Sequence, residues 1–88
     1  MDLDLTPRYD SRKSFYGKAI VRVYDDGTRK LFSYHTSVAS IYPNGFFRVK
    51  GWFSATTARH INEFLQQNGL SKMTKAQMDG HYEVREQW

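Results

Sequence analysis

One long stretch of the chain, from Trp52 to Gly69, repeats apolar residues at the spacing of an α-helix. Its apolar positions would form a single stripe of Ala58, Ile61, Phe64 and Leu65. Ser54 or Thr56 can cap the first turn by accepting a hydrogen bond from a backbone N–H group that the helix leaves unpaired. Gly69 can adopt the left-handed conformation that ends many helices. The pattern therefore predicts one main helix over residues 55–68.

Upstream of this helix, apolar and polar residues alternate with a period of two in four successive stretches. This alternation predicts four strands, over residues 15–24, 29–34, 38–42 and 46–52. Turn-forming residues separate them, at 25–28, 35–37 and 43–45. Because short connections join neighbouring strands as antiparallel pairs, the expected fold is α+β, a four-stranded antiparallel β-meander with the main helix packed across one face. A short second helix is expected over residues 71–78, with Thr74 as its cap.

The chain divides into three expected parts. Residues 1–14 show no hydrophobic period and are expected to form a flexible N-terminal arm. Residues 15–80 are expected to form the single α+β domain, and residues 81–88 a C-terminal tail or an edge strand. Within the domain, the sheet and the helix should bury large apolar side chains against each other, namely Phe32, Phe47, Val49, Ile61, Phe64 and Leu65.

Composition narrows the class of protein. The 88 residues suffice for one domain with a modest core. The chain has no cysteine, which excludes disulfide bridges and thiolate metal sites. No apolar run approaches the roughly 20 residues that span a bilayer, so no membrane partner is expected. The net charge of +4 favours a polyanionic partner only modestly, because the basic residues are dispersed among acidic ones.

Two segments resemble the motifs of one protein family. Residues 31–39, LFSYHTSVA, resemble a YSYxTxVA segment, and residues 52–62, WFSATTARHIN, resemble a WxSxTTxRHIN segment. In this order and at about this separation, they are similar to segments of a family of small uncharacterised proteins encoded by bacteriophages and prophages. The resemblance covers residues 29–70 and implies a phage origin and a location in the host bacterial cytoplasm. It implies no catalytic residues.

Candidate catalytic chemistry is sparse. The histidines, His35, His60 and His81, do not stand at metal-ligand spacing, and no motif of a serine or cysteine nucleophile is present. Asp25 and Asp26 lie in a predicted turn, where aspartate is expected for backbone reasons. We therefore expect a protein that is not an enzyme, with no catalytic residue, no metal site and no cofactor.

The first turn of the main helix concentrates polar residues. A structural corner between the last strand and the helix is expected from Ser54, Thr56, Thr57 and His60. His60 would there hydrogen-bond a strand residue such as Ser33 or Tyr34. The alternative is an anion site, because a helix N-terminus attracts negative charge and Arg59 can donate to a phosphate.

Strand alternation also predicts a basic and aromatic surface on the side of the sheet away from the helix. Its expected binding residues are Arg22, Tyr24, Phe46, Arg48, Lys50 and Trp52. On the outward side of the helix, Arg59 is a further binding candidate unless it pairs with Glu63. Such a surface suits a protein partner, because aromatic residues and arginine are enriched at interface hot spots. It equally suits single-stranded nucleic acid, in which bases stack on aromatic rings. Burial against the C-terminal segment or in a homodimer is the third alternative.

Together these expectations favour a small phage accessory protein that binds a host bacterial protein and modulates or inhibits it. A factor of bacterial defence or of nucleic-acid handling is the expected class of target. Direct binding of single-stranded nucleic acid by the sheet face is the alternative, and a structural component of the virion is a third.

Overall fold

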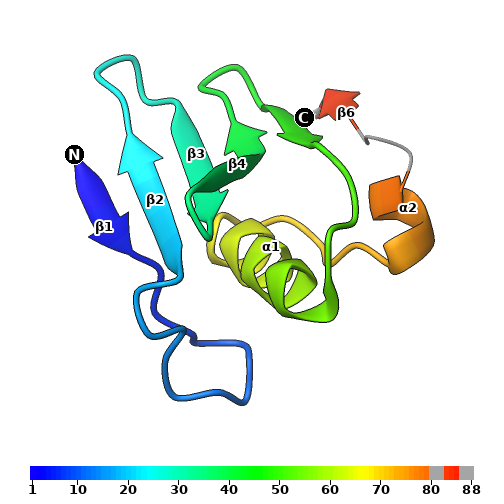
Figure 1. Ribbon diagram of the computed structural model, residues 1–88. Helices are drawn as coiled ribbons and strands as arrows, with labels where there is room; N and C mark the ends of the chain where they lie inside the picture. Colours follow the sequence, from blue (N-terminus) through cyan, green and yellow to red (C-terminus); the bar gives the residue numbers. More distant parts are fainter. Residues whose placement is uncertain (80–82, 86–88) are drawn as a thin grey trace.

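The computed structural model describes residues 1–79 and 83–85 of the chain (Figure 1). Within these residues the strands are β1 (Asp2–Asp4), β2 (Ala19–Val23), β3 (Arg29–Ser33), β4 (Thr36–Ile41), β5 (Phe46–Val49) and β6 (Glu83–Arg85). The helices are α1 (Ala55–Gln67) and α2 (Lys75–Asp79). In this described part of the chain, neither helix has the length and the apolar character needed to cross a membrane.

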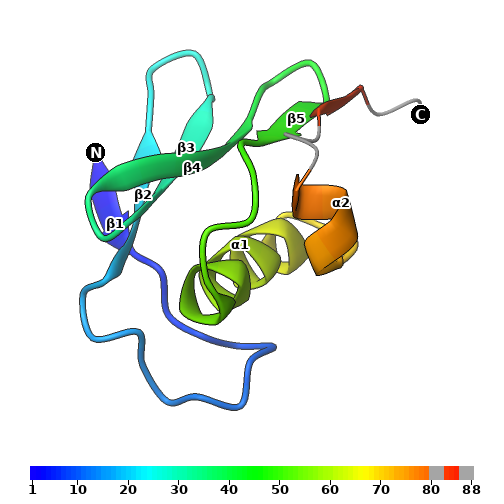
Figure 2. The ribbon, with the colours of Figure 1, turned by 45° about the vertical axis from the view of Figure 1, so that its right-hand side comes forward.

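The strands lie side by side in the order in which they follow along the chain. β1 to β5 form a five-stranded antiparallel sheet, and β6 pairs with the outer edge of β5. α1 packs across one face of this sheet, and no described element covers the other face (Figures 1 and 2). The α+β class, the antiparallel meander and the covering helix were therefore predicted correctly, whereas the number of four strands was wrong.

The missed strand β1 lies in the segment for which an arm was expected. Asp2 to Asp4 pair with Ile20 to Arg22 of β2. Leu5, directly after the strand, is only 6% exposed, and Phe15 is 5% exposed. A strand of three residues that contains two aspartates has too little hydrophobic alternation to be recognised from sequence.

In the C-terminal segment, residues 83–85 form β6, and residues 81–82 and 86–88 lie outside the described part.

Side-chain alternation in β3 is opposite to the prediction. Phe32 was expected in the core, but Leu31 occupies that position with 0% exposure. Phe32 points to the other face of the sheet, where the guanidinium carbon of Arg22 lies 4.8 Å from its ring centre. Ser33 takes the next inward position and is 2% exposed. An inward serine is stable here because α1 supplies its hydrogen-bond partner, His60.

The core fills the space between α1 and the sheet. The other expected core residues are buried as predicted, namely Phe47, Val49, Ile61, Phe64 and Leu65. Residues outside the sheet and α1 complete the core, and these are Leu5, Phe15, Met73 and Met78. Burial of Leu5 and Phe15 thus holds both ends of the segment between β1 and β2. Burial of Met73 and Met78 holds the segment that follows α1.

Both ends of α1 follow the sequence signals. The Ser54 hydroxyl caps the helix by accepting the backbone N–H of Thr57 at 3.1 Å. At the other end, Gly69 has a φ of +80°. Its N–H donates to the carbonyl of Gln66 at 3.1 Å, and the N–H of Leu70 donates to the carbonyl of Leu65 at 2.9 Å. This pair of bonds is the Schellman arrangement, which only the left-handed glycine conformation allows without strain.

The second helix is shorter than expected. It begins at Lys75, after Thr74, whose hydroxyl accepts the N–H of Gln77 at 3.3 Å. In return the side-chain oxygen of Gln77 accepts the N–H of Thr74 at 2.9 Å. This reciprocal capping box fixes the first turn, and Met78 then anchors the helix in the core.

Candidate functional site

The face of the sheet opposite α1 carries the residues of the first candidate site, which we name the open face. By strand alternation and contact it consists of Ile20, Arg22, Tyr24, Lys30, Phe32, Phe46 and Arg48, with Lys18 and Tyr34 at the edge that it shares with the start of α1. Cross-strand pairing aligns Arg22 with Lys30, Lys30 with Ser40, and Ser40 with Arg48. A single row of residues across four strands therefore presents three basic side chains.

Basic side chains of the open face lie over aromatic rings. The Arg22 guanidinium lies 4.8 Å from the centre of the Phe32 ring, and the Lys30 ammonium 5.5 Å from that of Tyr24. The Lys18 ammonium lies 5.6 Å from the Tyr34 ring centre. Cation–π attraction holds each head group near its ring. Three cations of the open face therefore each lie above an aromatic ring.

Acidic positions of the neighbouring strands offset part of this charge, because Asp2 pairs with Arg22, Asp4 with Ile20 and Glu83 with Arg48. Asp2 of β1 accepts from Nε of Arg22 at 2.9 Å and from Nη2 at 3.3 Å. The hydrogen bond from Arg22 lowers the pKa of Asp2 below its usual value, so the pair stays ionised. Beside it, a hollow of about 530 Å³ is lined by residues of β1, β2, β3 and the β3–β4 turn, including Asp2, Arg22, Phe32 and Tyr34.

Only part of the predicted binding set lies on the open face. Arg22, Tyr24, Phe46 and Arg48 do, and the prediction missed Lys18, Lys30 and Phe32. Trp52 does not, because strand geometry ends at Val49 and Gly51 stands between the strand and the tryptophan. Trp52 is half-buried against the core on the α1 side. Lys50 follows β5, and its N–H donates to the Val38 carbonyl at 2.9 Å.

Hydrogen bonds join the polar corner at the start of α1 to β3. The Ser33 hydroxyl lies 2.8 Å from Nδ1 of His60 and 3.0 Å from the Thr57 hydroxyl. His60 is 1% exposed, and the Phe15 ring packs edge-on against it with 4.5 Å between ring centres. Burial lowers the pKa of His60, with smaller and opposite influences from Asp10 and Arg12. The imidazole is therefore neutral at pH 7 and ties β3 to α1.

The contact between Ser33 and His60 has the residue types of a catalytic serine–histidine pair, a role that was not expected from the sequence. A nucleophilic serine must reach its substrate, yet Ser33 is 2% exposed and His60 1%. Thr56, the remaining corner residue, lines a small hollow of about 150 Å³ beside His60.

Among the described residues, no three side chains of His, Cys, Asp or Glu are placed to hold a metal ion.

Glu63 has a role that its outward position on the predicted helix did not suggest. Its carboxylate is 1% exposed. Oε1 accepts the backbone N–H groups of Tyr9 at 3.0 Å and Asp10 at 2.9 Å, and Oε2 accepts that of Arg8 at 2.9 Å. The side-chain amide of Gln67 also donates to Oε2, at 2.6 Å. Glu63 thus anchors the segment that was expected to be a flexible arm.

The electrostatic balance at Glu63 favours the charged carboxylate. Burial alone would raise its pKa, but hydrogen bonds from Gln67 and from the N–H groups of Arg8, Asp10 and Tyr9 outweigh burial and lower the pKa below its usual value. The expected pair between Arg59 and Glu63 does not form. Arg59 instead donates to both oxygens of Asp10, at 3.0 and 3.3 Å.

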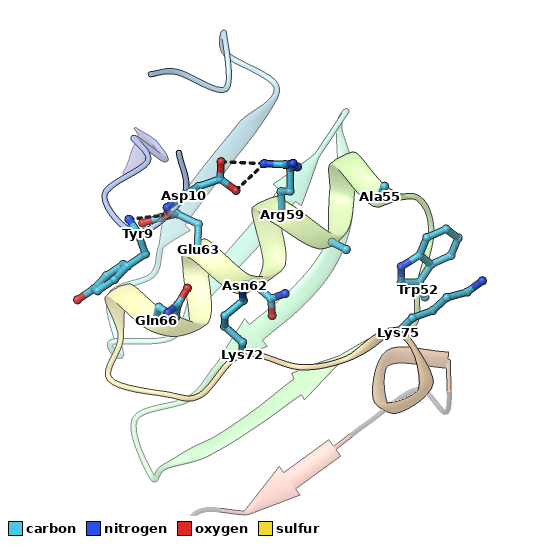
Figure 3. Close-up of a pocket in the computed structure, with 11 residues that line it drawn as sticks. Tyr9, Asp10, Trp52, Ala55, Arg59, Asn62, Glu63, Gln66, Lys72 and Lys75 are labelled. Carbon is cyan, nitrogen blue, oxygen red and sulfur yellow. Dashed lines mark hydrogen bonds and ion pairs between the residues drawn. The ribbon is translucent and has the colours of Figure 1, made fainter. Parts of the chain in front are cut away.

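A groove along the solvent side of α1 is the second candidate site, and we name it the α1 groove. Its volume is about 510 Å³. It is lined by Tyr9, Asp10, Trp52, Ala55, Ala58, Arg59, Asn62, Glu63, Gln66, Lys72 and Lys75. Figure 3 shows Tyr9 towards one end and Trp52 with Lys75 at the other. The Lys75 ammonium lies 4.4 Å from the centre of the Trp52 ring.

Comparison with known proteins identifies a family. The model of a family of unknown function, DUF8033, matches residues 3–80 of the chain. The match begins within β1 and includes β2 to β5, the Glu63-anchored segment and both helices. No curated protein and no solved structure matches the chain.

Proposed function

The chain belongs to the DUF8033 family of unknown function, and from its geometry we propose that it is a non-enzymatic binding protein whose open face docks on another protein. The observation that carries this proposal is the uncovered sheet face with its row of Arg22, Lys30 and Arg48. An antiparallel sheet can leave one face to water, but the arginines and aromatic rings on this face are residue types that suit contact with a protein partner.

The arrangement of rings and charges favours a protein partner over nucleic acid. Phe32, Tyr24 and Tyr34 each have a cation of the same chain over the ring. A nucleobase would have to displace that cation before it could stack. An acidic protein surface can instead pair with the cations in place, while the half-exposed rings add apolar contact at the centre of the interface.

The identity of the partner is proposed from the sequence motifs. The segments at residues 31–39 and 52–62 resemble those of small phage and prophage proteins, which supports a phage accessory protein acting on a host factor in the bacterial cytoplasm. A factor of bacterial defence or of nucleic-acid handling is the proposed class of target.

Reversing two charges of the open face should abolish capture of the host partner. In the variant Lys18→Glu/Lys30→Glu, two cations that rest on aromatic rings become carboxylates facing an acidic partner, and like charges opposed across an interface weaken it. Tagged protein is incubated with nuclease-treated host lysate, and bound proteins are identified. The expected result is a discrete partner held by the wild type and lost from the variant.

The matched control for this experiment is Arg8→Glu/Lys13→Glu. Its two side chains are exposed, lie outside both candidate sites, and give the same change in net charge. Equal capture by the wild type and the open-face variant would refute docking through this face. If the control variant also loses capture, the change in net charge explains the result and the position of the charges on the open face does not.

Single-stranded nucleic acid is the second candidate partner, and the row of cations is the observation that supports it. In that case a labelled oligothymidylate binds directly, and the logarithm of its affinity falls with the logarithm of salt concentration with a slope of about −0.7 per contacted phosphate. Nuclease treatment of the lysate would then remove whatever the protein captures. Absence of oligonucleotide binding at low salt eliminates this candidate.

A further inference from the structure

The α1 groove is a separate surface from the open face, on the other side of the sheet (Figures 1 and 3). We propose that it binds a short, extended, acidic segment of a protein partner. This proposal does not depend on the function proposed for the open face, because none of the open-face residues lines the groove.

Both walls of the groove are fixed to α1 by hydrogen bonds. On one side, Glu63 holds the backbone of Tyr9 and Asp10, and Arg59 holds the Asp10 carboxylate. On the other side, the Asn62 side chain donates to the Met73 carbonyl at 3.2 Å and accepts the Met73 N–H at 2.8 Å. Because these bonds are all within the chain itself, binding would order little additional chain.

One face of α1 forms the floor of the groove. Ala55, Ala58, Asn62 and Gln66 recur there at helical spacing. The two alanines leave room between the Trp52 ring and the opposite wall for an aliphatic side chain. From Ala55 to Gln66 the helix rises by roughly 16 Å, which corresponds to about five residues of extended chain. The length therefore fits a peptide better than a small ion.

The charges of the groove select an acidic occupant. The carboxylates in its lining are already engaged, Glu63 by its buried hydrogen bonds and Asp10 by Arg59 and the N–H of Arg12. Lys72 and Lys75 are exposed, and within residues 1–79 neither has a carboxylate at ion-pair distance. Two ammonium groups thus line one wall, beside an indole ring. Carboxylates on one side of a peptide would meet them and stay away from Asp10 on the opposite wall, whereas a nucleic-acid backbone carries a negative charge on every phosphate along its length.

The proposal is tested by selecting from a display library of random peptides about ten residues long, which exceeds the five or so that fill the groove. Peptides are selected on the full chain and sequenced, and one enriched peptide is synthesised. The expected sequences carry at least two Asp or Glu residues beside an aliphatic residue. In ¹⁵N-labelled protein, the peptide should shift the amide signals of Ala55 and Ala58 and the indole N–H of Trp52.

Charge reversal at the rim provides the quantitative test. The variant Lys72→Glu/Lys75→Glu should bind the peptide about tenfold more weakly or worse, because two attractive pairs become repulsive. Arg8→Glu/Lys13→Glu, with the same net charge, should bind as the wild type does. The dispersion of the amide signals confirms that each variant is folded.

Several outcomes would overturn the proposal. Enriched peptides without acidic residues, or equal affinity for the wild type and the groove variant, would exclude an acidic segment. Shifts confined to the open face would place the peptide elsewhere. The same groove shifts produced by raising the protein concentration alone would assign the groove to a second copy, and the same shifts with oligothymidylate would assign it to nucleic acid.

Discussion

Replacing Glu63 by alanine should lower the free energy of unfolding by about 3 kcal/mol, because several hydrogen bonds to one buried carboxylate are lost together. The carboxylate accepts the N–H groups of Arg8, Tyr9 and Asp10 and the Gln67 amide. Chemical denaturation measures the loss. Amide hydrogen exchange should locate it, since the N–H groups of residues 8–10 should exchange fast in the variant even where the protein remains folded.

Two variants distinguish this anchor from ordinary helix surface. Glu63→Gln keeps the shape, but its NH₂ group faces the N–H of Arg8 or the Gln67 amide, so it should remain destabilised by about 1–2 kcal/mol. Gln66→Ala, next to Gln67 but without any bond to residues 8–10, should change the stability by less than about 0.5 kcal/mol. If Glu63→Ala unfolds like Gln66→Ala and residues 8–10 stay protected, Glu63 is not the anchor.

The anchor also predicts the response to acid. The pKa of Glu63 is lower in the folded protein than in the unfolded chain, where it is about 4.3. The charged Glu63 therefore contributes fully to folding stability above the unfolded-state pKa. This contribution is lost as the pH falls through the lowered folded-state pKa. The stability difference between wild type and Glu63→Gln should shrink in this acid range. A difference that stays constant down to the lowest pH at which both fold would contradict the assignment.

Replacing His60 by alanine is the second substitution with a large expected effect, a destabilisation of about 2–4 kcal/mol, because it empties a buried site and removes a hydrogen bond. The ring is 1% exposed, packs against Phe15 and lies 2.8 Å from the Ser33 hydroxyl. Thermal and denaturant unfolding measure the change. Ser33→Ala should lose less, about 1 kcal/mol, and a double-mutant cycle with His60→Ala should show coupling. Additive losses would mean that the hydrogen bond contributes nothing.

The buried imidazole predicts a second dependence on pH. Burial lowers the pKa of His60 in the folded protein, so the neutral ring contributes fully above the unfolded value of about 6.5. Stability should then fall as the pH drops below about 6.5 towards the lowered folded-state pKa. His60→Gln removes the titrating group and should flatten this part of the profile, which begins at a higher pH than the acid range of Glu63. An unchanged slope in the variant would refute the effect of burial.

The sequence anticipated the parts of the fold that depend on neighbouring residues. Ser54 and Gly69 mark the ends of α1 because capping is decided within one turn of the helix. The alternation in β5 assigned Phe47 and Val49 to the core, where both are buried. The corner of Thr57 and His60 was recognised because polar residues at a helix start next to a strand need partners nearby.

Candidate surfaces were predicted less completely, for identifiable reasons. Arg22, Tyr24, Phe46 and Arg48 lie on the open face as alternation implied. Lys30 was missed because the pattern of β3 was assigned by its largest apolar residue, Phe32, and Trp52 was misplaced because alternation was continued through Gly51. No local signal distinguishes Lys72 and Lys75 from other exposed lysines. They form a groove only because the Asn62 side chain holds Met73 beside α1.

The sequence by itself determined that this protein is a small α+β domain with a capped helix over an antiparallel meander, since periodicity and capping are properties of adjacent residues. The tertiary structure alone decided that residues 2–4 form a sheet strand, that Glu63 is buried, and that Ser33 rather than Phe32 faces inward. Each of these depends on a partner supplied from far along the chain, because a charged or polar group is buried only where distant donors and acceptors satisfy it. For Glu63 those donors are the N–H groups of the segment that the sequence presented as an arm.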